Sequence, residues 1–265
     1  MSNIMTEQES EISVLRGGIL FMYTQYARVV FILLSLICMG TLILASTLGA
    51  GRPTHQYIAH LFAKWYFWSI GIHVRVHDRK KFPKRGPLLF ISNHQTYLDQ
   101  FLLYAAFPSG FSSMYTYQGS EGELNFLGPL LSRIGIIPVE PGDPKSVERG
   151  LHWASRQLEE NRIFMIMPEE TPTRSGDPPR RFKRGCGWIL VKKDVPVQFI
   201  YLKNAVKITP HPELLSPGLI ECYIGSVTKT DLSGVTDGKK DRASMIADYL
   251  LKKYLEEFNL TGRNT

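Results

Sequence analysis

The sequence predicts an α/β domain, in which helices flank a mixed sheet, preceded by an N-terminal transmembrane helix. Short apolar runs alternate with amphipathic segments from about residue 72 onward, and one uncharged apolar stretch lies near the N-terminus. Alternating strands and helices indicate a layered α/β architecture. Because 44% of the 265 residues are hydrophobic, the chain can build a substantial core.

The apolar stretch runs from Val29 to Leu48 without a charged residue. At about 1.5 Å per residue, a helix of this length spans roughly 30 Å, which is the thickness of the hydrocarbon core of a bilayer. We therefore expect a polar segment over 1–28 and a transmembrane helix over 29–50. A fully buried helix of a soluble protein is the alternative, although such helices are usually shorter.

A second apolar segment, too short to span a bilayer, lies within residues 51–72. It carries Trp65 and Trp68, which suit the boundary between membrane and water. An interfacial or re-entrant helix is expected here, and a core helix of the soluble domain is the alternative. Residues 73–265 would then form the soluble domain. Many Lys and Arg residues follow the apolar stretch, so the positive-inside rule places this domain on the cytoplasmic side of the membrane.

Periodicity and turn-forming residues divide the domain into elements. The sequence predicts strands over 73–77, 87–92, 135–140, 162–167, 195–202 and 220–227. It predicts helices over 98–106, 145–161 and 241–258. Asp143 and Pro144 mark the start of the second helix as its N-cap and first helical residue. Residues 172–184 and 228–242 are rich in Gly, Pro and charge, so loops are expected there.

The formal net charge of +7 suits an anionic partner, such as a membrane surface or a nucleotide-bearing donor. The sequence has no recognisable nucleic-acid motif, so no nucleic-acid partner is expected. The chain has three cysteines, an odd number, and no C-x-x-C spacing occurs among Cys38, Cys186 and Cys222. Neither a disulfide framework nor a zinc site is therefore expected.

The candidate catalytic pair is His94 and Asp99, in the stretch FISNHQTYLD where a predicted strand turns into a predicted helix. This H-x4-D spacing is weak evidence alone, because His73 and Asp78 share it, and only its context favours the first pair. An imidazole with an ordinary pKa of about 6.5 suits a base that activates a hydroxyl. A carboxylate behind the ring fixes its tautomer and stabilises the imidazolium. The alternative is a surface histidine beside a cap-like aspartate.

Four further motifs follow NHQTYLD in order, namely GIIPVE, MPEETPTR, FKRG and VPVQFIYL. Over roughly residues 70–205 this set closely resembles the lysophosphatidic acid acyltransferase (1-acylglycerol-3-phosphate O-acyltransferase) family. The resemblance implies a glycerolipid acyltransferase-like fold and a membrane-bound enzyme of phospholipid biosynthesis. Such an enzyme moves a fatty acyl group from acyl-CoA or acyl carrier protein to the free hydroxyl of a lysolipid, nominally lysophosphatidic acid, which becomes phosphatidic acid. The resemblance implies no metal and no organic cofactor.

The resemblance also implies roles for single residues. His94 would be the general base and Asp99 its orienting partner. The expected substrate-binding residues are Asn93, Glu169, Thr171, Arg174, Lys183 and Arg184. Among them, Glu169 matches the glutamate of the P-E-G-T-R motif, which in the family helps to bind the acceptor. For the basic cluster within 180–184, a solvated loop is the alternative to anion binding.

Three positions depart from the family pattern. Pro141 and Pro172 stand where the family usually has arginines, and Glu170 replaces the motif glycine. Arginine–phosphate pairs are strong contacts, and a carboxylate repels a phosphate. The departures favour a neutral, zwitterionic or amine-bearing acceptor, whereas the basic residues within 174–184 favour a phosphate. A non-catalytic lipid-binding relative and a thioesterase, in which His94 activates water, are the other function classes.

Overall fold

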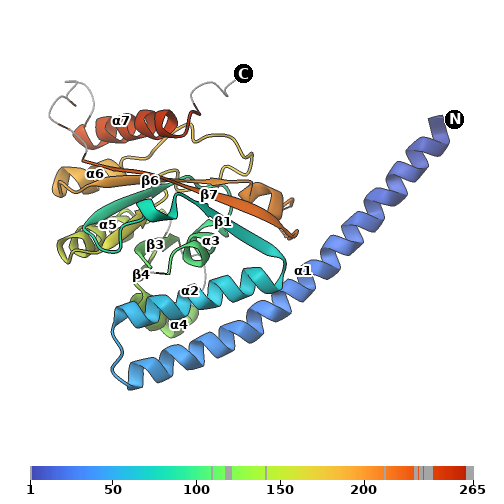
Figure 1. The fold of residues 1–265 in the computed structure, drawn as a ribbon, viewed down its shortest axis with the longest axis horizontal. Helices are drawn as coiled ribbons and strands as arrows, with labels where there is room; N and C mark the ends of the chain where they lie inside the picture. The colour runs from blue at the N-terminus through green and yellow to red at the C-terminus, as the bar shows by residue number, and fades with distance from the viewer. Residues whose placement is uncertain are drawn as a thin grey trace.

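A mixed seven-stranded sheet lies at the centre of the computed structural model, with helices on both faces (Figure 1). The structure describes residues 2–108, 110–116, 121–140, 142–211, 213–229, 232, 235 and 241–260. The strands are β1 (Ile72–His77), β2 (Leu88–Ser92), β3 (Ser112–Thr116), β4 (Ile136–Val139), β5 (Ile163–Ile166), β6 (Val197–Lys203) and β7 (Gly218–Thr228). The helices are α1 (Ser2–Thr47), α2 (Arg52–Ser69), α3 (Asp99–Ala106), α4 (Glu121–Ile134), α5 (Pro144–Glu159), α6 (Gly185–Lys192) and α7 (Arg242–Glu257), with 3-10 turns η1 (Arg79–Lys81) and η2 (Ala205–Ile208).

The strands follow the order β1-β7-β6-β2-β5-β3-β4 across the sheet. The β6–β7 pair is antiparallel, and the other neighbouring pairs are parallel. Every residue of β2 and β5 is buried, as expected for strands of a sheet that is covered on both faces. The predicted mixed sheet flanked by helices is therefore confirmed.

Alternate residues of β2 belong to two hydrophobic cores. Leu88 and Phe90 pack with residues of α2 and α3, whereas Leu89 and Ile91 pack with residues of α5, α6 and α7. Successive side chains of a strand point to opposite faces of its sheet, so one short strand supplies both cores. The chain that follows β2 consequently leaves the sheet between two packed layers.

The six predicted strands and three predicted helices are confirmed, with ends that differ by one or two residues. Asp143 accepts hydrogen bonds from the backbone N–H groups of Lys145 and Ser146, so the predicted N-cap is also confirmed. The sequence did not predict β3, α4 or α6. Pro129 lies inside α4 and two glycines lie inside α6, so local pattern argued against a helix in both.

Helix α1 is continuous from Ser2 to Thr47, so residue 29 lies inside it. The division into a polar segment over 1–28 and a transmembrane helix over 29–50 stays a prediction. The apolar part of α1, Val14–Thr47, is long and apolar enough to cross a membrane, and little of it is buried. By length and composition alone this helix is compatible with a membrane anchor.

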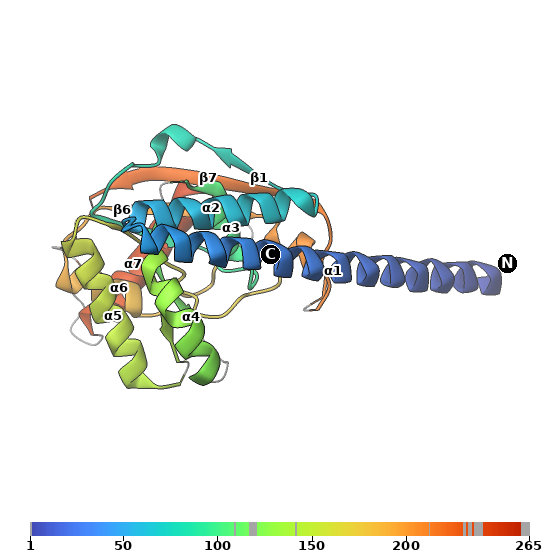
Figure 2. The same ribbon diagram turned by 90° about the horizontal axis from the view of Figure 1, so that it is seen from below.

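Helix α2 lies beside α1 under the sheet (Figures 1 and 2). Ala63 and Phe67 are buried on the face of α2 that packs against the domain, whereas Trp65 and Trp68 are exposed. The two alternatives for this segment therefore describe two faces of one helix. One face belongs to the core of the domain, and the other presents tryptophans to the surroundings.

The approach of α6 to α7 generates a stability prediction. A Cβ added at Gly187 would lie 1.9 Å from the carbonyl oxygen of Ala243. We expect Gly187→Ala to lower the free energy of unfolding by about 1–3 kcal/mol, the usual cost of overpacking. Thermal unfolding followed by tryptophan fluorescence checks this. Gly185→Ala, in the same helix, is the matched control because its Cβ would make an ordinary contact of 3.5 Å with Leu151. Equal melting temperatures for the two variants would contradict the close approach.

Candidate active site

Asn93 connects the end of β2 to β6. Its amide nitrogen donates to the carbonyl oxygen of Leu202 at 2.9 Å, and its amide oxygen accepts from the N–H of Leu202 at 2.8 Å. The side chain is 1% exposed, and the backbone already occupies both ends of its amide. The binding of substrate by Asn93 stays a prediction. In the structure its side chain holds the end of β2 against β6, one residue before His94.

His94 and Asp99 meet across the turn between β2 and α3, as the sequence predicts. Nδ1 of His94 lies 2.9 Å from Oδ2 of Asp99. An ionised carboxylate only accepts hydrogen bonds, so Nδ1 carries the ring hydrogen and Nε2 keeps its lone pair. The imidazole is therefore oriented to take up a proton at Nε2. The catalytic role itself stays a prediction.

The carboxylate of Asp99 is completely buried and fully hydrogen-bonded. Besides His94, it accepts from the N–H of Gln95, from the N–H of Thr96 at 2.9 Å and from the hydroxyl of Thr96 at 2.8 Å. Asp99 is also the first residue of α3, where the helix dipole favours negative charge. These contacts offset the cost of burying a charge. Thr96 was missed by the sequence analysis, although its T-x-x-D spacing resembles a capping box.

The second pair with the same spacing does not come together. His73 lies near the start of the extended strand β1, and Asp78 follows the end of that strand. A strand rises about 3.3 Å per residue, so the strand separates the two side chains. Asp78 forms its ion pair with Lys81 instead, at 3.1 Å. The interpretation of this second pair as a coincidence of spacing agrees with the geometry.

The loop that follows β5 holds the backbone on both sides of His94. Oε1 of Glu169 accepts from the N–H of His94 at 2.6 Å. The N–H of Thr173 donates to the carbonyl oxygen of His94 at 3.0 Å, and the N–H of Arg174 donates to that of Gln95 at 3.1 Å. Glu169 was expected to bind substrate, and the structure places its carboxylate on the backbone of His94.

Burial raises the pKa of Glu169 to about 7, and the negative charge of Asp99 acts in the same direction. The hydrogen bond from the N–H of His94 opposes this shift. Glu169 therefore titrates near neutral pH while it contacts the backbone of the candidate base.

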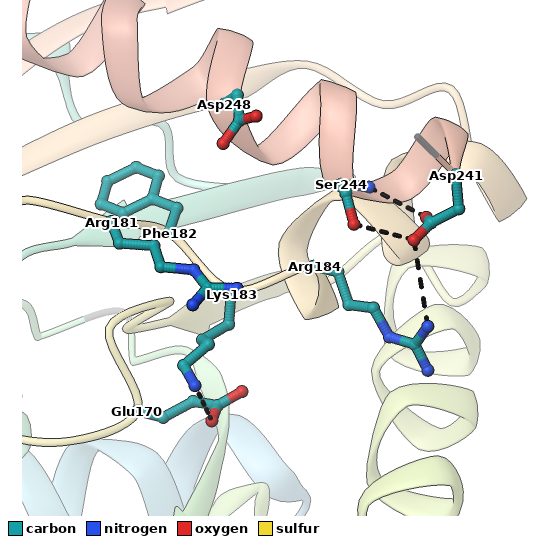
Figure 3. Close-up of a pocket in the computed structure, with 8 residues that line it drawn as sticks. All are labelled: Glu170, Arg181, Phe182, Lys183, Arg184, Asp241, Ser244 and Asp248. Atoms are coloured by element: carbon teal, nitrogen blue, oxygen red, sulfur yellow. Dashed lines mark hydrogen bonds and ion pairs between the residues drawn. The ribbon is translucent and has the colours of Figure 1, made fainter. Parts of the chain in front are cut away.

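The remaining predicted residues fall into two places. Thr171 and Arg174 are exposed in the loop beside His94. Lys183 and Arg184 instead line a neighbouring pocket of about 580 Å³ between this loop and α7, and His94 does not line it (Figure 3). The structure therefore does not gather all the expected substrate-binding residues at one point.

Glu170 occupies the motif position where the family has glycine, and its φ of 65° lies in the left-handed region that favours glycine. Its carboxylate lies 3.9 Å from Nζ of Lys183, and across the pocket Arg184 lies 4.0 Å from the carboxylate of Asp241 (Figure 3). The negative charge added by Glu170 is therefore offset by a neighbouring cation. Pro141, another of the departures, lies outside the described residues.

Within the part of the chain that the structure describes, no three His, Cys, Asp or Glu side chains group closely enough to hold a metal ion. The expectation of no organic cofactor stays a prediction. The chemistry that the described geometry supports is proton transfer at Nε2 of His94.

The buried carboxylate of Asp99 generates a prediction about stability. In Asp99→Asn, an NH2 group replaces an oxygen that accepts hydrogen bonds, so buried N–H donors lose their acceptor. We expect the free energy of unfolding to fall by about 1–3 kcal/mol, measured by denaturant titration. Asp143→Asn is the matched control, because asparagine caps a helix as well as aspartate does. Equal stability of the two variants would contradict the hydrogen-bond network.

The raised pKa of Glu169 predicts a pH dependence. An unfolded glutamate ionises near 4.5 and the folded one near 7, so the unfolded state gains stability as pH rises between these values. The contribution of Glu169 is therefore fully present below about pH 4.5 and is lost by about pH 7. We expect Glu169→Gln to lose less stability than wild type across this interval, measured by melting temperature. Glu160→Gln is the control and should follow the wild-type dependence of melting temperature on pH. If Glu169→Gln followed it too, the raised pKa of Glu169 would be contradicted.

The chain resembles known proteins in sequence and in fold. A model of the Acyltransferase family matches residues 73–203, about half of the chain, and this range contains both His94 and the loop after β5. The crystal structure of the 1-acyl-sn-glycerophosphate (LPA) acyltransferase PlsC from Thermotoga maritima has the same fold, with a TM-score of 0.66 and 19% sequence identity. That likeness covers 94% of this chain and 99% of the other.

Two curated relatives are similar in sequence. The 1-acyl-sn-glycerol-3-phosphate acyltransferase of Helicobacter pylori is 32% identical over 123 residues, which are 46% of this chain and 51% of the relative. The chloroplastic 1-acyl-sn-glycerol-3-phosphate acyltransferase LPAT1 of Arabidopsis thaliana is 27% identical over 164 residues, 60% of this chain and 44% of the relative. The chain thus spans about half the length of the curated relatives it matches. It belongs to the acyltransferase family and is similar to its 1-acyl-sn-glycerol-3-phosphate acyltransferases.

Proposed function

We propose that the chain is a membrane-bound O-acyltransferase of phospholipid biosynthesis. It would transfer a fatty acyl group from the thioester of acyl-CoA or acyl carrier protein to the free hydroxyl of lysophosphatidic acid, giving phosphatidic acid. Membership of the acyltransferase family and the names of the relatives support this reaction. The observation that carries the proposal is the contact of 2.9 Å between Nδ1 of His94 and Oδ2 of Asp99.

The geometry of this pair suits the proposed chemistry. Nε2 of His94 takes the proton of the acceptor hydroxyl as the oxygen attacks the thioester carbonyl. A C–O bond forms, the C–S bond breaks, and the imidazolium returns its proton to the leaving thiolate. Asp99 stabilises the imidazolium and holds the productive tautomer. No enzyme nucleophile is required, because the acceptor hydroxyl attacks directly.

The two N-terminal helices support the membrane assignment. The apolar surface of α1 is mostly exposed, and Trp65 and Trp68 on α2 are exposed beside it. Apolar surface and tryptophans at its edge are typical of contact with a bilayer. We propose that this layer anchors the domain on the cytoplasmic side, where its lipid acceptor would be reached from the membrane.

A second candidate differs in the acceptor. Pro141 and Pro172 leave two motif positions without the arginines that would bind a phosphate, which favours a lysolipid whose head group is not a phosphate monoester. Glu170 argues less strongly in this direction than the sequence indicates, because Lys183 offsets its charge. The preference among acceptors is therefore the measurement that separates the two candidates.

The test is acyl transfer from acyl-CoA and from acyl carrier protein to a panel of lysolipids, with wild type and variants in matched membranes. We expect lysophosphatidic acid to be the preferred acceptor and His94→Ala to lower the rate by about 10²–10⁴-fold without loss of the folded protein. His73→Ala is the matched control, since His73 has the same spacing to an aspartate without the contact.

The other outcomes identify the competing classes. Preference for a neutral or amine-bearing lysolipid would select the second candidate. Hydrolysis of the donor without any acceptor would indicate a thioesterase. The absence of product with every acceptor, or equal turnover by His94→Ala, would contradict the proposed function.

A further inference from the structure

We infer that Arg28 of α1 and Arg174 of the loop after β5 bind the phosphate group of the acceptor lipid. This inference rests on the proposed function and names the residues that recognise its head group. Arg28 is not part of any motif, and it lies far from the others in the sequence.

Helix α1 is fixed against the domain one turn on either side of Arg28. The ring of Phe31 lies 6.2 Å from that of Phe101 on α3 and 5.3 Å from that of Tyr66 on α2. On the preceding turn, the hydroxyl of Thr24 accepts from the N–H of Leu215 at 2.9 Å. Toward the N-terminus from here, α1 extends beyond the domain (Figure 1).

The contact between Phe31 and Phe101 places Arg28 near the start of α3. Arg28 precedes Phe31 by three residues, so the two side chains share a face of α1. Phe101, which Phe31 contacts, follows Tyr97 by four residues. Tyr97 is 48% exposed in the turn between His94 and α3.

The backbone of Arg174 contacts the same turn. Its N–H donates to the carbonyl oxygen of Gln95 at 3.1 Å, so its backbone lies directly beside the turn. Burial raises the pKa of the Tyr97 phenol, and the positive charges of Arg28 and Arg174 both oppose that shift. Both guanidinium groups therefore act electrostatically on one phenol.

Neither cation is neutralised by a carboxylate among the described residues. Arg28 contacts only the amide oxygen of Gln25, at 3.4 Å, and Arg174 makes no ion pair within the described chain. Both side chains are exposed, so an arriving anion would meet them without competition from a carboxylate of the described chain. A phosphate monoester accepts hydrogen bonds from arginine in a paired geometry and carries enough charge for two.

The position of Arg28 on its helix indicates that the anion belongs to a lipid. Arg16 and Arg28 are the two charged residues within Val14–Thr47, and the uncharged run begins directly after Arg28. An arginine at the end of an apolar helix places its charge at the boundary between membrane and water, where lipid head groups lie. The head group of a lysolipid would lie where the apolar surface ends, beside His94. The cations of the pocket in Figure 3 are less suited, because Lys183 and Arg184 are each within 4.0 Å of a carboxylate.

The test measures binding without turnover. The His94→Ala protein, in nanodiscs of phosphatidylcholine, is titrated with lysophosphatidic acid and with monoacylglycerol, which lacks the phosphate. Adding Arg28→Gln should weaken binding of lysophosphatidic acid by about tenfold or more, the effect of losing a hydrogen bond to a charged group. It should leave monoacylglycerol binding unchanged. Arg16→Gln, on the same helix but away from the domain contact, is the matched control and should bind like the parent.

Two results would overturn the inference. Equal affinity of the Arg28→Gln and Arg16→Gln proteins for lysophosphatidic acid would remove Arg28 from the site. Displacement of the lysolipid by an equal concentration of inorganic phosphate would show a site for free phosphate and not for the lipid.

Turnover of the Arg28→Gln variant with His94 intact, measured in parallel, separates this inference from the proposed function. Product from wild type with an unchanged KM in Arg28→Gln refutes the phosphate site alone. No product from wild type, with binding still lost in Arg28→Gln, refutes the proposed function alone.

Discussion

The buried carboxylate of Asp99 is the constraint on which the geometry of the site depends. A charge without solvent is tolerated only when hydrogen bonds saturate it, and here the two backbone N–H groups, the threonine hydroxyl and the imidazole all point at one side chain. Each of these donors belongs to residues 94–96, so satisfying Asp99 fixes the whole turn. The orientation of His94 is one consequence of this saturation.

The turn also depends on contacts from distant parts of the chain. Asn93 connects the end of β2 to Leu202 on β6, and Glu169 and Thr173 hold the backbone of His94 from the loop after β5. These strands are neighbours in the sheet, since β2 pairs with both β5 and β6. Parallel pairing brings their carboxyl ends to one edge, where the three motifs meet. Motifs that are far apart in the sequence therefore lie close together in space.

The helix layers on the two faces of the sheet give this edge two different surroundings. The α1–α2 layer presents apolar side chains and exposed tryptophans, whereas the α5–α7 layer borders the pocket of paired charges. The added carboxylate of Glu170 lies in that pocket and is offset by Lys183. Arg28 instead lies on the apolar layer without an ion pair among the described residues. An anionic head group would therefore meet a cation without a carboxylate partner on the side of α1, whereas Lys183 and Arg184 in the pocket each lie near a carboxylate.

The sequence alone determined the features that depend on local pattern. Short apolar runs predicted β2 and β5, Asp143 and Pro144 predicted the start of α5, and the turn around His94 and Asp99 predicted a contact that the structure confirms. Tertiary structure decided the rest. The glycines of α6 and Pro129 of α4 disfavour helix locally, and packing overrides them. The contact of Asn93 with Leu202, the place of Glu169 and the contact of α1 with α3 arise from pairings between segments far apart in the chain. Spacing along a sequence carries no information about such pairings, because the topology of the sheet creates them.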